Sequence, residues 1–198
     1  MLKPKDFDQT TAYGEFKPLE LGGHICQIMQ VDETQSRTGK PMLIISLDTA
    51  PQDTQPGYYA EQYRADDRPD KKWGCRVFQL VYDNEGKTSK GFKTFITAVE
   101  KSNSGFQVEW GDGFAACFKN RLVGGVFGRE QYENSAGELK WSTKCVQFRS
   151  LEAIQNGVEA PKDKYIEGRQ PSASVYTPER ASTVNDFAVI DDDEDLPF

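Results

Sequence analysis

The 198-residue sequence lacks features that several classes of protein require. It has no apolar run near the roughly 18 residues of a membrane-spanning helix, and residues 1–16 lack the apolar stretch of a secretory signal. Its single histidine excludes motifs built on two histidines, and no two cysteines have the Cys-x-x-Cys spacing of a metal or redox site. We therefore expect a cytoplasmic protein that does not enter the membrane.

The four cysteines, Cys26, Cys75, Cys117 and Cys145, are widely spaced along the chain. They indicate reduced, buried thiols of a cytoplasmic protein rather than a disulfide framework. His24 and Cys26 are a weak hint of a zinc site, whose other ligands would have to come from distant strands. We predict that the protein binds no metal and no cofactor.

The sequence shows no arrangement of residues that is typical of an enzyme. Acidic residues are scattered, with no pair placed for general acid and base catalysis, and His24 falls within a strand pattern. Gly86-Lys87-Thr88 resembles the end of a phosphate-binding loop, but Val81 stands where that motif needs a glycine. We predict that the protein is not an enzyme, and an enzyme of unrecognised type, such as a nuclease, is the disfavoured alternative.

Acidic residues outnumber basic ones by 31 to 24, and the formal net charge is −7. The last eight residues, DDDEDLPF, contain five acids and no base. Residues 1–190 therefore carry 26 acids and 24 bases, a net charge of −2. Because binding responds to local potential more than to total charge, this nearly neutral body can still carry a basic groove.

The order of predicted elements favours one mainly β domain. We expect strands at 24–31, 41–50, 75–82, 121–133 and 138–150, and an amphipathic helix at 90–101. Five strands with one helix between the third and fourth are the order of a five-stranded OB-fold barrel. Glycines at 124, 125 and 128 indicate the bends that a small barrel needs. The alternative is another small β-rich α+β domain.

The remaining segments suggest a domain followed by an extension. Residues 51–74 form a long polar insertion without apolar periodicity, and 114–118 are expected to be a short extra strand or a turn. We assign residues 1–160 to the folded domain. Residues 161–190, rich in Ser, Thr and Pro, are predicted to be a flexible linker, and 191–198 an acidic tip, so that the C-terminal tail is disordered.

Basic residues interleave with aromatic ones, which is the chemistry that binds single-stranded nucleic acid: cations follow the backbone and flat rings stack on unpaired bases. Strand alternation places Arg76 and Phe78 on one face, and places Lys140 and Lys144 opposite Trp141. Taken one at a time, Phe78, Tyr82 and Trp141 fit a role in the core better than a role as a stacking platform, and it is the cluster that suggests binding. The candidate contacts are Arg37, Lys40, Tyr63, Lys71, Lys72, Trp73, Arg76, Phe78, Arg129, Tyr132, Lys140, Trp141 and Lys144.

The acidic tip predicts a second site. It consists of Asp191, Asp192, Asp193, Glu194, Asp195, Leu196, Pro197 and Phe198. The acidic run attracts a basic patch over a long range, and Phe198 offers a ring and a free carboxylate to an apolar pocket with a cation at its edge. We interpret the tip as a docking segment for partner proteins, and the alternative is a tail that only improves solubility.

The combination of a predicted OB-fold, a linker and an acidic tip ending in Pro-Phe resembles bacterial and phage single-stranded DNA-binding proteins. The likeness is close over Asp191–Phe198 and only architectural over residues 20–150. The long insertion at 51–74 suggests a divergent version from a phage or mobile element.

The resemblance implies a non-sequence-specific coat on single-stranded DNA during replication and recombination. It further implies a tip that recruits replication, recombination or repair proteins and competes weakly with DNA. It is compatible with a homo-oligomer, and with a nucleoid-associated location in a bacterial cell or a phage-infected host. The alternative function is an adaptor in such a system that docks partner proteins without coating DNA.

Overall fold

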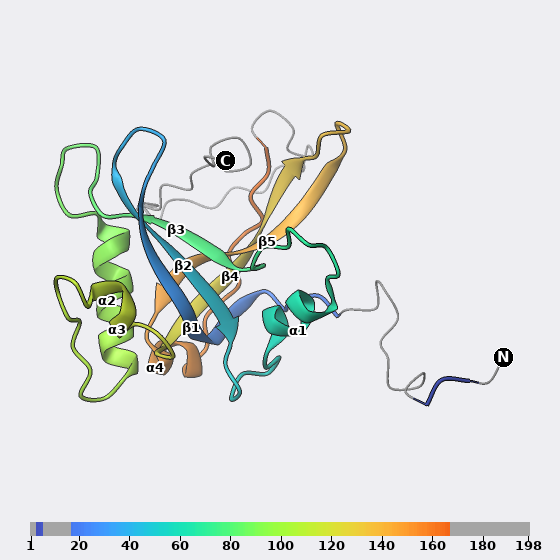
Figure 1. The fold of residues 1–198 in the computed structure, drawn as a ribbon, viewed down its shortest axis with the longest axis horizontal. Helices are drawn as coiled ribbons and strands as arrows, with labels where there is room; N and C mark the ends of the chain where they lie inside the picture. Colours follow the sequence, from blue (N-terminus) through green and yellow to red (C-terminus); the bar gives the residue numbers. More distant parts are fainter. Residues whose placement is uncertain (1–2, 6–16, 167–198) are drawn as a thin grey trace, which may run out of the picture.

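The computed structural model describes residues 3–5 and 17–166 of the chain (Figure 1). The elements in chain order are β1 (Gly22–Gln35), β2 (Pro41–Thr49), α1 (Tyr58–Ala65), β3 (Arg76–Leu80), α2 (Lys90–Ser102), α3 (Phe114–Cys117), β4 (Leu122–Glu133), β5 (Leu139–Arg149) and α4 (Leu151–Gln155). The prediction of a mainly β fold with five strands is confirmed. The helix expected between the third and fourth strands is α2, and α4 falls where 151–157 are expected to form a brief helical turn; α1 and α3 are two further helices among the described residues.

The five strands form one antiparallel sheet in the order β3-β2-β1-β4-β5. β3 and β5 are its edge strands, and in the described part of the chain no pairing joins them, so the sheet is open rather than a closed barrel. Irregular register between Ile28 and Gln30 and between Val126 and Phe127 marks two bulges. Such bulges bend strands and increase their twist, which is visible where the strands cross in Figure 1.

Helix α2 closes one end of the core. Its apolar residues at positions i, i+3, i+4 and i+7, Phe92, Phe95, Ile96 and Val99, are all buried, as the sequence pattern predicts. The helix contacts β3, β4 and β5, and the Phe95 ring lies 5.0 Å from that of Phe148 on β5. α2 therefore covers the core near both edge strands. Within the described ranges no helix is long and apolar enough to cross a bilayer.

Two helices lie where the sequence predicts none. α1 forms inside the polar insertion because side chains at the end of β2 cap its first turn. Asp48 accepts the backbone N–H of Tyr59 at 2.9 Å, and Thr49 accepts that of Tyr58 at 2.9 Å. The insertion lacks apolar periodicity, and its helix depends on caps that lie 9 and 11 residues upstream of the capped amides. Periodicity within the insertion therefore does not reveal the helix.

Helix α3 corrects the prediction of a strand or a turn at 114–118. Phe114 and Phe118 are four residues apart, which places them on the same side of a helical turn. Their rings lie 5.1 Å apart, and the Phe118 ring also lies 5.1 Å from that of Phe95 on α2. Both side chains are buried, so packing against α2 selects the helical conformation.

A buried pair, His24 and Asp53, joins β1 to the loop that follows β2. Their side chains are 3% and 4% exposed, and His24 Nδ1 lies 2.9 Å from Asp53 Oδ2. Burial by itself lowers the pKa of His24, but the hydrogen bonds to Asp53 and to the Glu20 carbonyl outweigh it, and the pKa is raised overall. For Asp53, burial raises the pKa, but hydrogen bonds from His24 and from backbone amides lower it overall.

The direction of the His24 shift predicts how stability depends on pH. The pKa of His24 is raised in the folded state, so protonated His24 stabilises the fold. This contribution to the unfolding free energy is complete below the ordinary histidine pKa of about 6.5, and it is lost as pH rises through the folded pKa. We expect the difference in unfolding free energy between the natural protein and His24→Gln to shrink between about pH 6 and about pH 9. Urea denaturation at the two pH values measures this difference. A difference that grows with pH would contradict a raised pKa of His24 in the folded state.

Candidate nucleic-acid interface

The outer face of the β2–β3 ladder carries two of the predicted contacts. Val77 and Gln79 are buried, while Arg76 and Phe78 on the alternate positions of β3 are only half-buried. The Arg76 guanidinium carbon lies 5.7 Å from the centre of the Phe78 ring. Phe78 pairs with Ile44 of β2. Phe78 is therefore on the face opposite the core, with a cation beside its ring and an aliphatic side chain next to it.

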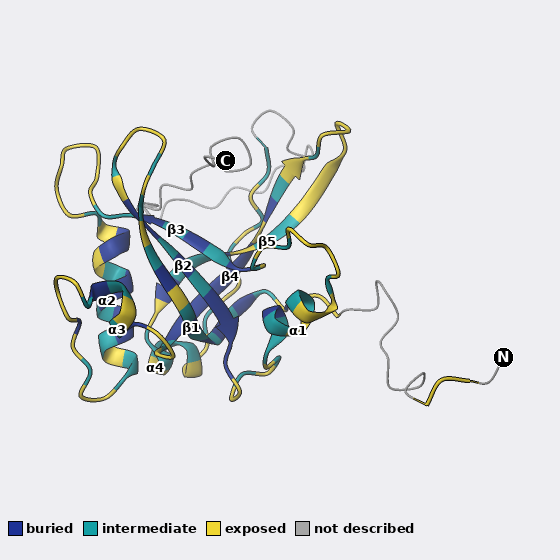
Figure 2. Ribbon diagram, in the orientation of Figure 1, coloured by how far each residue is buried: buried dark blue, intermediate teal, exposed yellow. Residues whose placement is uncertain are grey.

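The distal parts of β4 and β5, residues 128–144, form a hairpin that we call the arm. Figure 2 shows that much of its surface is exposed, in contrast to the buried parts of the same strands. Arg129 and Trp141 share one face of the arm, and the Arg129 guanidinium carbon lies 4.9 Å from the Trp141 ring centre. Trp141 is 39% exposed. The arm thus carries a second pair of a cation and a ring.

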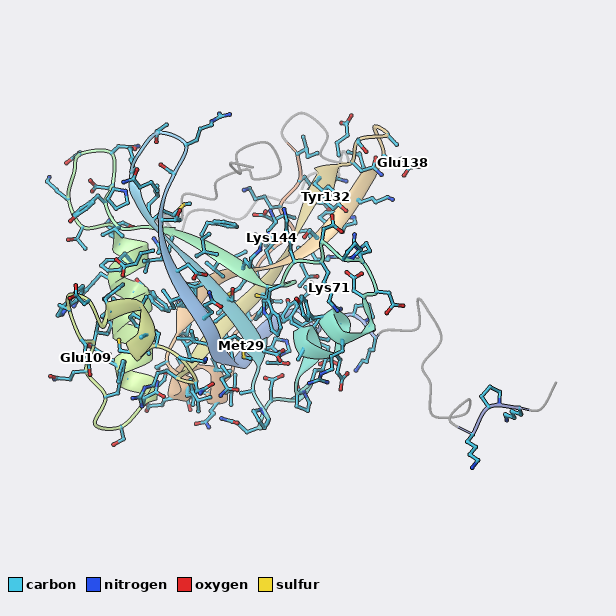
Figure 3. All side chains as sticks on the ribbon, in the orientation of Figure 1. Met29, Lys71, Glu109, Tyr132, Glu138 and Lys144 are labelled. Carbon is cyan, nitrogen blue, oxygen red and sulfur yellow. The ribbon has the colours of Figure 1, made fainter. Side chains whose placement is uncertain are left out.

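The opposite face of the arm carries Tyr132, Lys140 and Lys144. Tyr132 pairs directly with Lys140 in the β4–β5 ladder, and Figure 3 shows Tyr132 and Lys144 along the arm. Lys144 lies 3.1 Å from a carboxylate oxygen of Glu130, and Lys140 lies 3.3 Å from one of Glu138. The two lysines are therefore both engaged with acids on the arm, which lowers the local positive potential.

The first hairpin loop, between β1 and β2, carries Arg37 and Lys40. Lys40 Nζ donates a hydrogen bond of 2.7 Å to Asn84 Oδ1 in the loop after β3. The two loops therefore meet, as Figure 1 shows beside the upper end of α2. Arg37 is exposed at the tip of its loop. This loop lies at a different part of the molecule from the arm (Figure 1).

The insertion brings Tyr63, Lys71 and Trp73 together. The rings of Tyr63 and Trp73 lie 5.5 Å apart, and Lys71 Nζ lies 4.5 Å from the centre of the Tyr63 ring. Lys71 also donates to the carbonyls of Tyr63 and Asp66, both at 2.9 Å, at the end of α1. Trp73 Nε1 donates to the Leu47 carbonyl at 2.6 Å. These contacts hold the insertion against β2.

The predicted contacts consequently fall into separate groups rather than one continuous row. Two residues lie on the loop between β1 and β2 and one pair lies on β3. Another pair and three further residues lie on the arm, and three residues are tied into the insertion. Lys72 is exposed beside that last group. The acidic tip, 191–198, lies outside the residues that the structure describes.

Sequence reasoning missed two residues next to the arm, Asp163 and Tyr165. They belong to 161–166, which the sequence analysis assigns to the linker, yet these residues lie against β4. Asp163 forms a two-point ion pair with Arg129, and the Tyr165 ring lies 5.1 Å from that of Trp141. The ion pair raises the pKa of Arg129 and lowers that of Asp163. The single signal in the sequence was the isolated Tyr165 in a polar stretch.

Trp110 is a further exposed aromatic residue that the sequence analysis did not select. It is 68% exposed and stacks on Phe114, with ring centres 5.3 Å apart. It lies in the loop between α2 and α3, next to Glu109, which Figure 3 places far from the arm. Its neighbours in the sequence, Glu109 and Asp112, are acidic, so Trp110 does not match the pattern of a cation beside a ring.

The donor groups of the described residues do not form a metal centre. In residues 3–5 and 17–166 no group of three His, Cys, Asp or Glu side chains is placed to hold an ion. All four cysteines are free, and burial raises the pKa of the Cys26, Cys75 and Cys145 thiols, for Cys145 to about 12. These thiols are therefore protonated at neutral pH.

Comparison with known proteins gives no family for this chain. No protein-family model matches it, and no curated protein matches it. Its function is accordingly inferred from the fold and from the groups of residues described above.

Proposed function

We propose that this protein is a non-catalytic OB-fold protein that binds single-stranded DNA with little sequence preference. The strand order β3-β2-β1-β4-β5, with α2 between β3 and β4, supports this fold, because it is the order of a five-stranded Greek-key barrel left open between β3 and β5. In such folds the face of the second and third strands and the loops beside it bind oligonucleotides. Arg76 and Phe78 lie on the corresponding face here.

The observation that carries the proposal is the repeated pairing of a cation with a partly exposed ring. Arg76 accompanies Phe78, and Arg129 accompanies Trp141. A ring of this kind stacks on an unpaired base, and the neighbouring cation contacts the phosphate of the same strand. Stacking tolerates any base, because every base has a flat face, which accounts for binding without sequence preference.

The ion pairs on the arm favour single strands over duplex DNA. Arg129, Lys140 and Lys144 each pair with an acid, so charge alone gives the arm little attraction for phosphates. Bases in a duplex are paired and stacked already, and cannot use the rings of Phe78 and Trp141. Single strands can, and stacking then supplies affinity that charge alone does not.

The acidic tip supports a second part of the proposal, the recruitment of replication, recombination or repair proteins. The tip, 191–198, would dock on a partner with an apolar pocket and a cation at its edge. The adaptor without DNA binding is the second candidate function. It is favoured by the acids that pair with Arg129, Lys140 and Lys144, because each pair reduces the attraction of the arm for phosphate.

Titration of the full chain with poly(dT) at several salt concentrations tests DNA binding against the adaptor function. We expect tryptophan fluorescence to be quenched, because Trp141 is exposed on the arm, and affinity to fall as salt rises, because bound phosphates release counterions. Trp141→Phe should remove much of the quenching. Trp110→Phe is the matched control and should retain it, because Trp110 lies far from the arm.

The titration separates the two candidate functions directly. Binding of poly(dT) that weakens with salt supports the DNA coat. Absence of binding at low salt would reject the coat and leave the adaptor. Quenching that disappears in the Trp110→Phe variant, and persists in Trp141→Phe, would remove the arm from the proposed interface.

A further inference from the structure

Residues 161–166, which we call the strap, extend beside the outer edge of the arm. Lys164 forms a parallel bridge with Glu130 of β4. Its N–H donates to the Arg129 carbonyl, and its carbonyl accepts from the Gln131 N–H, both at 2.9 Å. Pro161 lies over Gly128, where an added Cβ would come within 3.3 Å of the proline ring. The strap therefore lies on β4 like a short additional strand, at a position where the arm provides space for it.

Besides Pro161, three side chains of the strap reach the arm. Asp163 holds the guanidinium of Arg129 through two hydrogen bonds. The Tyr165 ring meets that of Trp141 edge to face, with centres 5.1 Å apart and planes at 80°. Lys164 Nζ lies 3.3 Å from Glu130. The strap thus places a carboxylate on the cation and a ring on the aromatic side chain of the same pair.

We infer that Arg129 and Trp141 form a subsite for one nucleotide of a single strand, and that the strap occupies this subsite when nucleic acid is absent. The inference rests on the proposed function. A carboxylate that pairs with arginine through two hydrogen bonds takes the place that a phosphate would take, because both anions match the guanidinium fork. The Tyr165 ring takes the place of the base.

The two occupants exclude each other at this subsite. Arg129 lies over the Trp141 ring and Tyr165 packs against it, so a base stacks on Trp141 only after Tyr165 leaves. The contacts that must break are weak enough to exchange. Arg129 is 43% exposed and Asp163 is 22% exposed, and ion pairs near water contribute little to stability. Release of the strap is therefore part of DNA binding at the arm.

The subsite is tested by measuring the affinity of full-length variants for oligo(dT). We expect Asp163→Asn to bind roughly two- to fivefold more tightly than the natural protein, because the competing anion is removed. Tyr165→Ala should also bind more tightly. Arg129→Gln should bind more weakly, and adding Asp163→Asn to it should change nothing further, because the strap carboxylate then has no cation to cover.

Glu109→Gln is the matched control, since it removes one negative charge from an exposed position far from the arm (Figure 3). Tightening by Asp163→Asn that exceeds this control and requires Arg129 supports the inference. Equal effects of the two variants, or tightening that persists in the Arg129→Gln background, would overturn it and indicate general electrostatics. Weaker binding by Tyr165→Ala would also overturn it, since Tyr165 would then be a DNA contact. Denaturation of each variant verifies folding, and lack of binding by the natural protein would reject the proposed function itself.

Discussion

Replacing Phe78 with alanine is expected to weaken the binding of poly(dT) roughly 5- to 150-fold, because a stacked base contributes about 1–3 kcal/mol. Phe78 lies on the outer face of β3, half-buried, with Arg76 5.7 Å from its ring centre. Its ring is therefore accessible to a base while the neighbouring guanidinium reaches the phosphate. Fluorescence titration or electrophoretic mobility shift measures the loss.

Two further substitutions at Phe78 separate stacking from packing. Phe78→Tyr keeps the ring and is expected to bind nearly as well as the natural protein. Phe78→Leu keeps a large apolar side chain against Ile44 but removes the ring, and should bind as weakly as the alanine variant. Full affinity in Phe78→Leu would show that the ring does not stack on DNA, and would remove β3 from the interface.

Replacing Asp53 with alanine is expected to lower the free energy of unfolding by about 3–5 kcal/mol, the cost of breaking a buried charged pair on one side. Asp53 is 4% exposed and holds His24 at 2.9 Å. It also accepts the backbone N–H groups of Ile25, at 2.8 Å, and of Gln55, at 3.0 Å. Alanine leaves all three donors without this acceptor in a partly buried position. Chemical denaturation monitored by circular dichroism measures the change.

Controls for Asp53 test the cause of this loss. Asp53→Asn keeps an oxygen acceptor and removes the charge, so it should cost less, about 1–3 kcal/mol. Asp67→Ala, at an exposed position of the insertion, should change stability by no more than about 0.5 kcal/mol. If Asp53→Ala unfolds at the same denaturant concentration as Asp67→Ala, the pair does not stabilise the fold as its geometry implies.

The regular elements of this protein were predictable where side-chain periodicity carried the information. Phe92, Phe95, Ile96 and Val99 recur with the period of a helix, and they form the buried face of α2. The alternation along β3 likewise predicted that Arg76 and Phe78 share a face. Periodicity did not predict whether that face or the other one is buried, and the packing of Val77 against the core decided it.

Contacts between residues far apart in the sequence decided what periodicity does not encode. α1 depends on caps from Asp48 and Thr49, and α3 on packing against Phe95. The position of the strap depends on the edge of β4 beyond Phe127, which is free because β1 begins at Gly22, the partner of Phe127. Neither a cap nor a strand edge leaves a repeating pattern in the segment that uses it.

The sequence by itself determined the five strands, the amphipathic helix and the concentration of negative charge in 191–198, because each is written in local composition or spacing. Only the tertiary structure decided how the candidate residues are grouped. It tied Lys71 and Trp73 into the insertion, and it placed Asp163 and Tyr165 on Arg129 and Trp141. The reason is physical. The sequence identifies a cation or a ring but not its partner, because the partner is set by which strands and loops the fold brings together.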